Sequence, residues 1–195
     1  MLLELPLRPV ITCLLGLCAL VTAGCDRQKA EEPQGNDAAP TAAASPRAGI
    51  DRSHRGEAAP DIQFQDPEGE PATLADFRGK PLLLNLWATW CAPCVAEMPT
   101  LDALAAREGD RLQVLALSQD LEGRAKVDQF FEARGLRHLD PFLDSEMAMM
   151  TALRAQALPV TILYDAEGKE VWRMNGPFEW NGEEARRLIG EAASR

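Results

Sequence analysis

LLLNLWATWCAPC, residues 82–94, is the stretch that decides the fold. Its first half, Leu82–Trp87, is an almost continuous apolar run, which is typical of a strand buried on both faces. Its second half places Cys91 and Cys94 on the first turn of a helix. Pro93 suits that turn because the first helical N–H groups have no intrahelical partner, so its missing N–H costs nothing. We expect a buried strand leading into a helix that carries two thiols at its N-terminus.

The two cysteines have the spacing of a reversible disulfide. A helix N-terminus carries unpaired N–H groups and partial positive charge, which favour a thiolate at Cys91. Cys94, three residues on, lies on the same helical face and can close the ring. The alternative is half of a zinc site, which needs two more ligands at matching spacing. The chain has no second CxxC and only His54 and His138, so a redox pair is favoured and no metal is expected.

Length and charge set outer limits on the protein. A chain of 195 residues is long enough for one compact domain with extensions. A hydrophobic content of 46% is ordinary for a globular protein. The net charge of −10 argues against a nucleic-acid partner. We expect a monomer.

Residues 1–25 have the pattern of an export signal. The apolar run Val10–Ala23 follows Arg8 and is shorter than the ~20 residues of a membrane span. Small residues precede Cys25, an ending that resembles the lipobox of bacterial lipoproteins and implies lipidation of Cys25. An ordinary cleaved signal or an uncleaved anchor remains the alternative. Either way, the Cys91–Cys94 pair would work in an oxidising compartment.

Residues 26–58 are rich in Ala, Pro, Gly and charge and nearly devoid of large apolar side chains. Such a segment cannot repay the entropy of ordering, so we expect a flexible tether ahead of a folded domain at 59–195. Periodicity within that domain predicts strands and helices in this order: a hairpin near 62–72, a strand at 82–88, a helix to 108, a strand at 112–117, a helix at 122–134, an extended piece at 141–143, a helix at 145–156, strands at 158–164 and 170–174, and a helix at 182–193. This order indicates an α/β fold with a mixed central sheet and helices on both faces.

The order of elements around WCxxC resembles the thioredoxin fold. Residues 79–99, GKPLLLNLWATWCAPCVAEMP, closely resemble the TlpA/ResA/CcmG branch of exported, membrane-tethered thiol-disulfide oxidoreductases. The resemblance covers about residue 59 to the end. It implies an N-terminal β-hairpin and a central extra strand and helix between 139 and 156. The segment Gly176–Trp180 is most similar to TlpA members.

The resemblance assigns roles at the dithiol. Cys91 would be the nucleophile and Cys94 the resolving thiol. Glu97 lies one turn after Cys94 on the same face, and the branch also carries a glutamate there, so we expect it to tune the pair; a solvated glutamate is the alternative. Ala92 and Pro93 place no imidazole between the cysteines, which favours a reductant or weak oxidant. No cofactor beyond the Cys91–Cys94 disulfide is expected.

Four further residues are candidates for substrate binding: Trp90, Pro93, Leu158 and Pro159. Pro159 matches the cis-proline of the thioredoxin fold, which shapes the groove and leaves the Leu158 backbone free to pair with an extended substrate. A trans proline that starts a strand is the alternative. Trp90 would lie at the rim of the site.

The resemblance also implies partners and location. Substrates would be protein disulfides, such as apocytochrome c haem-binding cysteines or copper-site cysteines of cytochrome oxidase and its assembly factors. Electrons would come from a membrane dithiol donor of the CcdA or DsbD kind. Asp26 after Cys25 implies a lipid anchor on the periplasmic side of the inner membrane; a soluble periplasmic or signal-anchored protein is the alternative. The rival function is a Cu(I)-binding metallochaperone that uses the same two thiolates.

Overall fold

The computed structural model describes residues 49–192. The predicted signal, the lipidation candidate Cys25 and most of the predicted tether lie outside the described residues. Within residues 49–192, no helix is both long and apolar enough to cross a bilayer.

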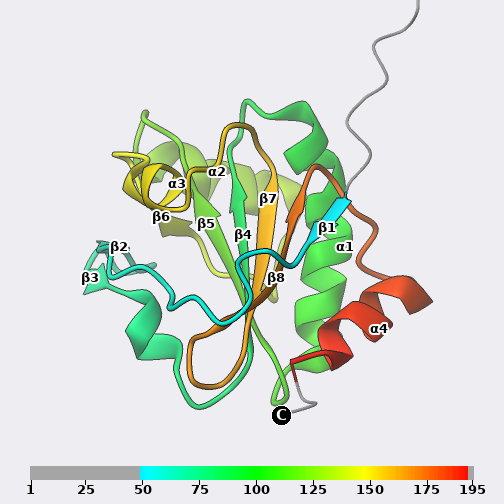
Figure 1. Ribbon diagram of the computed structural model, residues 1–195. Helices are drawn as coiled ribbons and strands as arrows, with labels where there is room; N and C mark the ends of the chain where they lie inside the picture. Colours follow the sequence, from blue (N-terminus) through cyan, green and yellow to red (C-terminus); the bar gives the residue numbers. More distant parts are fainter. Residues whose placement is uncertain (1–48, 193–195) are drawn as a thin grey trace, which may run out of the picture. The chain divides into compact units, whose positions relative to one another are not determined.

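A mixed eight-stranded sheet, in the order β1-β8-β7-β4-β5-β6-β2-β3, forms the centre of the fold (Figure 1). Strands β4, β5 and β6 are parallel, whereas β7 is antiparallel to β4 and β8 to β7. The strands are β1 (Gly49–Asp51), β2 (Phe64–Gln65), β3 (Pro71–Ala72), β4 (Leu82–Trp87), β5 (Gln113–Ser118), β6 (Phe142–Leu143), β7 (Val160–Tyr164) and β8 (Glu170–Asn175). The helices are the 3₁₀ turn η1 (Leu74–Phe77), α1 (Ala92–Glu108), α2 (Arg124–Arg134), α3 (Ala148–Ala152) and α4 (Glu183–Gly190).

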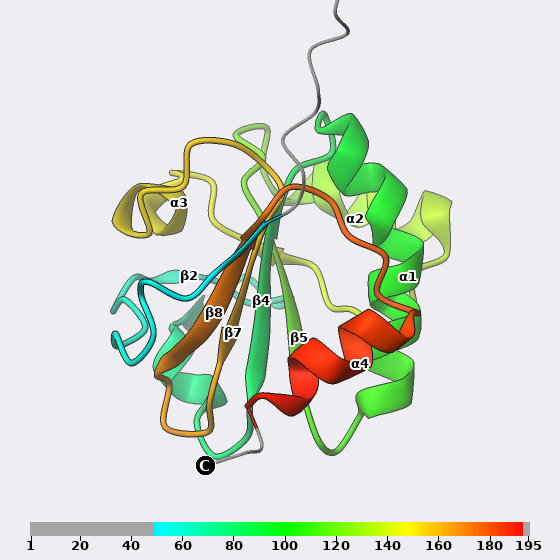
Figure 2. The same cartoon turned by 45° about the vertical axis from the view of Figure 1, so that its right-hand side comes forward.

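Helices cover both faces of the sheet, which confirms the predicted thioredoxin fold. Helices α1, α2 and α4 pack on one face, and α3 and η1 on the other (Figure 2). Side chains alternate along β4, as a strand requires. Leu83 and Trp87 join the core beneath α1, and Leu84 and Leu86 join the opposite core. The apolar run is therefore continuous because both faces are buried.

The predicted extra strand and helix between β5 and β7 are present as β6 and α3. The helix is shorter than the predicted 145–156. The Asp144 carboxylate accepts hydrogen bonds from the N–H groups of Ala148 and Met149, which fixes the helix start after residue 147. Arg154 then adopts a positive φ of 54°, which is incompatible with a continuing right-handed helix.

The boundary predicted at residue 59 is wrong, because the folded domain already includes Gly49. Strand β1 pairs with β8, and Ile50 packs against the core beneath α4 and α1. The Gly56 N–H then donates to the Glu170 carbonyl, and Arg52 forms an ion pair with Glu191. Backbone hydrogen bonds order this segment. Its composition gave no sign of them because they need no large apolar side chains.

Candidate active site

The carboxyl end of β4 leads directly into the dithiol at the start of α1. Cys91 and Cys94 are joined as a disulfide with their Cα atoms 5.3 Å apart. Cys91 caps the helix, and its sulfur accepts the Cys94 N–H at 3.3 Å. Cys91 is 6% exposed and Cys94 is fully buried, so an attacking group can reach only the first sulfur. A helix N–H on the Cys91 sulfur also favours its thiolate once the bond is reduced.

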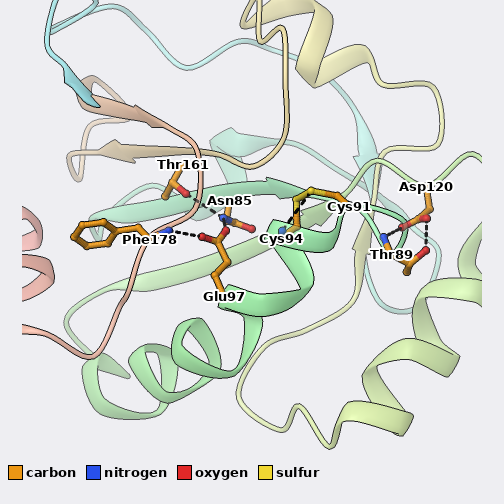
Figure 3. Close-up of a disulfide and its surroundings, with 8 residues drawn as sticks. All are labelled: Asn85, Thr89, Cys91, Cys94, Glu97, Asp120, Thr161 and Phe178. Carbon is orange, nitrogen blue, oxygen red and sulfur yellow. Dashed lines mark hydrogen bonds between the residues drawn. A yellow bond between two sulfur atoms is a disulfide. The ribbon is translucent and has the colours of Figure 1, made fainter. Parts of the chain in front are cut away.

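The turn before the disulfide is fixed by a buried carboxylate. Asp120, two residues after β5, accepts the Thr89 N–H at 2.9 Å and the Thr89 hydroxyl at 2.6 Å (Figure 3). Ser118 Oγ donates to the same carboxylate at 2.7 Å. These contacts hold the loop that carries Trp90, whose side chain is 64% exposed. An exposed indole thus belongs to the residue that precedes Cys91, and its contact with a substrate stays a prediction.

The predicted substrate-binding residues divide into exposed and buried positions. Pro93 is exposed on the first turn of α1. The Leu158–Pro159 peptide bond is cis, with Leu158 half-buried and Pro159 buried. Val160 pairs with Leu86 near the end of β4, so the cis bond lies at the edge of the sheet from which α1 departs. The geometry therefore brings the dithiol and the predicted substrate residues to one end of the domain.

Glu97 lies on the inner face of α1 and is 4% exposed, which excludes the solvated alternative. Its Oε1 accepts a hydrogen bond from Asn85 Nδ2 at 2.8 Å, and its Oε2 accepts one from the Phe178 N–H at 2.9 Å (Figure 3). Asn85 Nδ2 also donates to Thr161 Oγ1 at 3.0 Å. A network drawn from α1, β4, β7 and the loop after β8 thus surrounds the carboxyl group.

Burial raises the pKa of Glu97 from its ordinary 4.5 to about 7. The hydrogen bonds from the Phe178 backbone and the Asn85 amide stabilise the carboxylate and oppose that rise. Desolvation wins because the side chain is almost wholly removed from water. The result is a carboxyl group that can hold or release a proton near neutral pH.

Sequence reasoning missed three participants. Asn85 stands within the apolar run Leu82–Trp87, but its donation to Glu97 leaves no mark in the sequence pattern. Phe178 takes part through its backbone N–H, which carries no sequence signature. Asp120 could have been suspected, since a carboxylate directly after a buried strand needs partners.

The rival Cu(I)-binding function would use the thiolates of Cys91 and Cys94. No group of three or more His, Cys, Asp or Glu side chains in that part of the chain is placed to hold a metal ion. His138, in the segment between α2 and β6, is exposed.

Comparison with known proteins gives a consistent result. The thiol-disulfide oxidoreductase ResA of Geobacillus thermodenitrificans is 36% identical over 115 residues, 58% of this chain and 65% of that protein. The thioredoxin-like protein YneN of Bacillus subtilis is 32% identical over 115 residues, 58% of this chain and 66% of that protein. The chain therefore spans slightly less than two thirds of these relatives.

A solved structure of a thioredoxin-family thiol:disulfide interchange protein from Chlorobium tepidum has the same fold. Its TM-score is 0.59 at 20% identity, covering 71% of this chain and 97% of that one. The Redoxin family matches residues 54–189, which include the whole site. The chain thus belongs to the Redoxin family and has a thioredoxin-like fold.

Proposed function

We propose that this protein is a membrane-tethered thiol-disulfide oxidoreductase of the ResA type that reduces disulfides in specific exported proteins. One observation carries the proposal: the Cys91–Cys94 disulfide presents one nearly buried sulfur at a helix N-terminus, beside the exposed Trp90. The ResA relative is named a thiol-disulfide oxidoreductase, which supports the proposal.

The reaction follows from the unequal burial of the two sulfurs. In the reduced protein, the Cys91 thiolate attacks a partner disulfide and forms a mixed disulfide, and one partner thiolate leaves. Cys94 then loses its proton and attacks the Cys91 sulfur, which releases the second partner thiolate. The protein ends oxidised and the partner reduced by two electrons.

Glu97 is the proposed group that tunes this exchange. Its raised pKa near 7 allows it to change charge under the conditions in which the thiols react. Asn85 donates a hydrogen bond to Glu97 and lies beside Cys94, so it links the carboxyl group to the dithiol (Figure 3). Trp90, Pro93 and the Leu158–Pro159 peptide are the proposed docking points for an extended partner segment.

The partners belong to the same proposal. A membrane dithiol donor of the CcdA or DsbD kind would restore the reduced state, since an oxidising compartment would otherwise keep the pair closed. The substrates would be cysteines of apocytochromes c or of the copper site of cytochrome oxidase. Anchoring through a lipid on Cys25 would hold the protein at the periplasmic face of the inner membrane.

Mixed-disulfide trapping tests the proposal. Full-length Cys94→Ser, expressed in its native host, cannot resolve the intermediate and should accumulate partners covalently bound to Cys91, identifiable by mass spectrometry after reduction. Cys91→Ser is the matched control and should capture none of them. Equal capture by both variants, or capture by neither, would refute the reductase function.

A further inference from the structure

Asn85 has an unused hydrogen-bond acceptor beside the disulfide. The residue lies in the middle of β4 and is fully buried. Its amide nitrogen donates to both Glu97 Oε1 and Thr161 Oγ1, at 2.8 and 3.0 Å. These two donations use both amide hydrogens and fix the orientation of the side chain. Its oxygen, Oδ1, consequently points the other way.

Oδ1 of Asn85 has no hydrogen-bond partner within the described part of the chain. In Figure 3 it is directed toward Cys94, on the opposite side of the amide from Glu97. A buried acceptor without a donor is costly and uncommon, so its retention at a reactive centre needs an explanation. In the oxidised state Cys94 cannot donate a hydrogen bond to Oδ1, because a disulfide sulfur carries no hydrogen.

Reduction supplies the missing donor. A thiolate of the reductant attacks Cys91, the S–S bond breaks, and Cys94 leaves with the bonding pair and takes up a proton from water. A second reductant thiolate then displaces Cys91 from the mixed disulfide, so two electrons pass from two thiols to the protein. Cys94 is fully buried, and a water-excluded site favours the neutral thiol over the thiolate.

We propose that Asn85 Oδ1 accepts a hydrogen bond from the Cys94 thiol in the reduced protein, and that this bond shifts the redox equilibrium toward the dithiol. Asn85 is thus a positioning residue. The inference deepens the proposed oxidoreductase function and rests on it. The amide is well suited to this role, because it can donate to Glu97 and accept from Cys94 at once, which an ionised aspartate could not do.

The Cys94 S–H stretching band in infrared spectra tests the hydrogen bond directly. Full-length Cys91→Ala leaves the Cys94 thiol without a disulfide partner, and subtraction of the Cys91→Ala/Cys94→Ser spectrum isolates its band. We expect a band lowered in frequency, as for a hydrogen-bonded thiol, that rises when Asn85→Leu is added. A band at the free-thiol frequency in Cys91→Ala overturns the proposal, and this measurement does not require Asn85→Leu to fold.

The equilibrium with glutathione tests the consequence. We expect Asn85→Leu to shift the equilibrium about tenfold toward the disulfide, a change of about 30 mV for a two-electron couple. Thr161→Val is the control, because it disturbs the same network and leaves Oδ1 in place; it should change the equilibrium less than Asn85→Leu does. Equal shifts in both variants would show a merely structural role and refute the proposal. Partner trapping by Cys94→Ser does not depend on this outcome, so the two proposals fail separately.

Discussion

Replacement of Glu97 by glutamine should change how the stability of the oxidised protein depends on pH. The folded-state pKa of Glu97 is about 7, against an ordinary 4.5. The folded protein therefore binds this proton more tightly than the unfolded chain does, so the carboxyl favours folding at low pH and this contribution is lost as pH rises through 7. At about 1.36 kcal/mol per pKa unit, the loss amounts to about 3 kcal/mol. Glu97 is 4% exposed, so solvent screening reduces this value little.

The assay is urea unfolding of oxidised wild type and Glu97→Gln between pH 4 and pH 8.5. The amide cannot accept both hydrogen bonds that Glu97 accepts, which adds a cost independent of pH. The difference in unfolding free energy between the variant and wild type should therefore change by about 3 kcal/mol in favour of the variant between pH 4 and pH 8.5. Glu132→Gln, at an exposed site on α2, should follow the wild-type profile. A difference between Glu97→Gln and wild type that stays constant with pH would refute the assignment.

Two further predictions concern stability. A chain that begins at residue 59 should be less stable to urea than one that begins at residue 49, by roughly 2–4 kcal/mol. The shorter chain loses the β1–β8 hydrogen bonds and the burial of Ile50. Equal stabilities would show that the folded domain begins at residue 59. Arg173→Met should cost about 3–5 kcal/mol, because it leaves Glu170, 2% exposed, as an unpaired buried charge. The double variant Arg173→Met/Glu170→Leu should recover much of that loss in thermal unfolding, and no recovery would contradict the role of the ion pair.

The parts of the fold that the sequence predicted are those set by local side-chain patterns. The run Leu82–Trp87 is buried on both faces and reads as such, and the spacing of Cys94 and Glu97 places both on the inner face of α1. Strand β1 could not be predicted, because its three residues are held mainly by backbone pairing with β8.

The interior of the site was less accessible to prediction for a related reason. The partners of Asn85 lie 12 and 76 residues away, so only the folded sheet reveals that one amide joins Glu97 to Thr161. Asp120 approaches Thr89 across 31 residues in the same way. Contacts between common residue types that lie far apart in the chain produce no periodic pattern in a single sequence.

The donor that Phe178 offers to Glu97 belongs to the main chain. Exchanging the phenyl ring for almost any other side chain leaves this N–H in position; only proline abolishes it. The phenyl ring itself packs against the core and Trp180, so it is the exposed positions Pro177 and Glu179 that are free to vary while the acidity of the buried carboxyl is preserved. The proton chemistry of Glu97 thus depends here on the course of the backbone and not on the identity of one side chain.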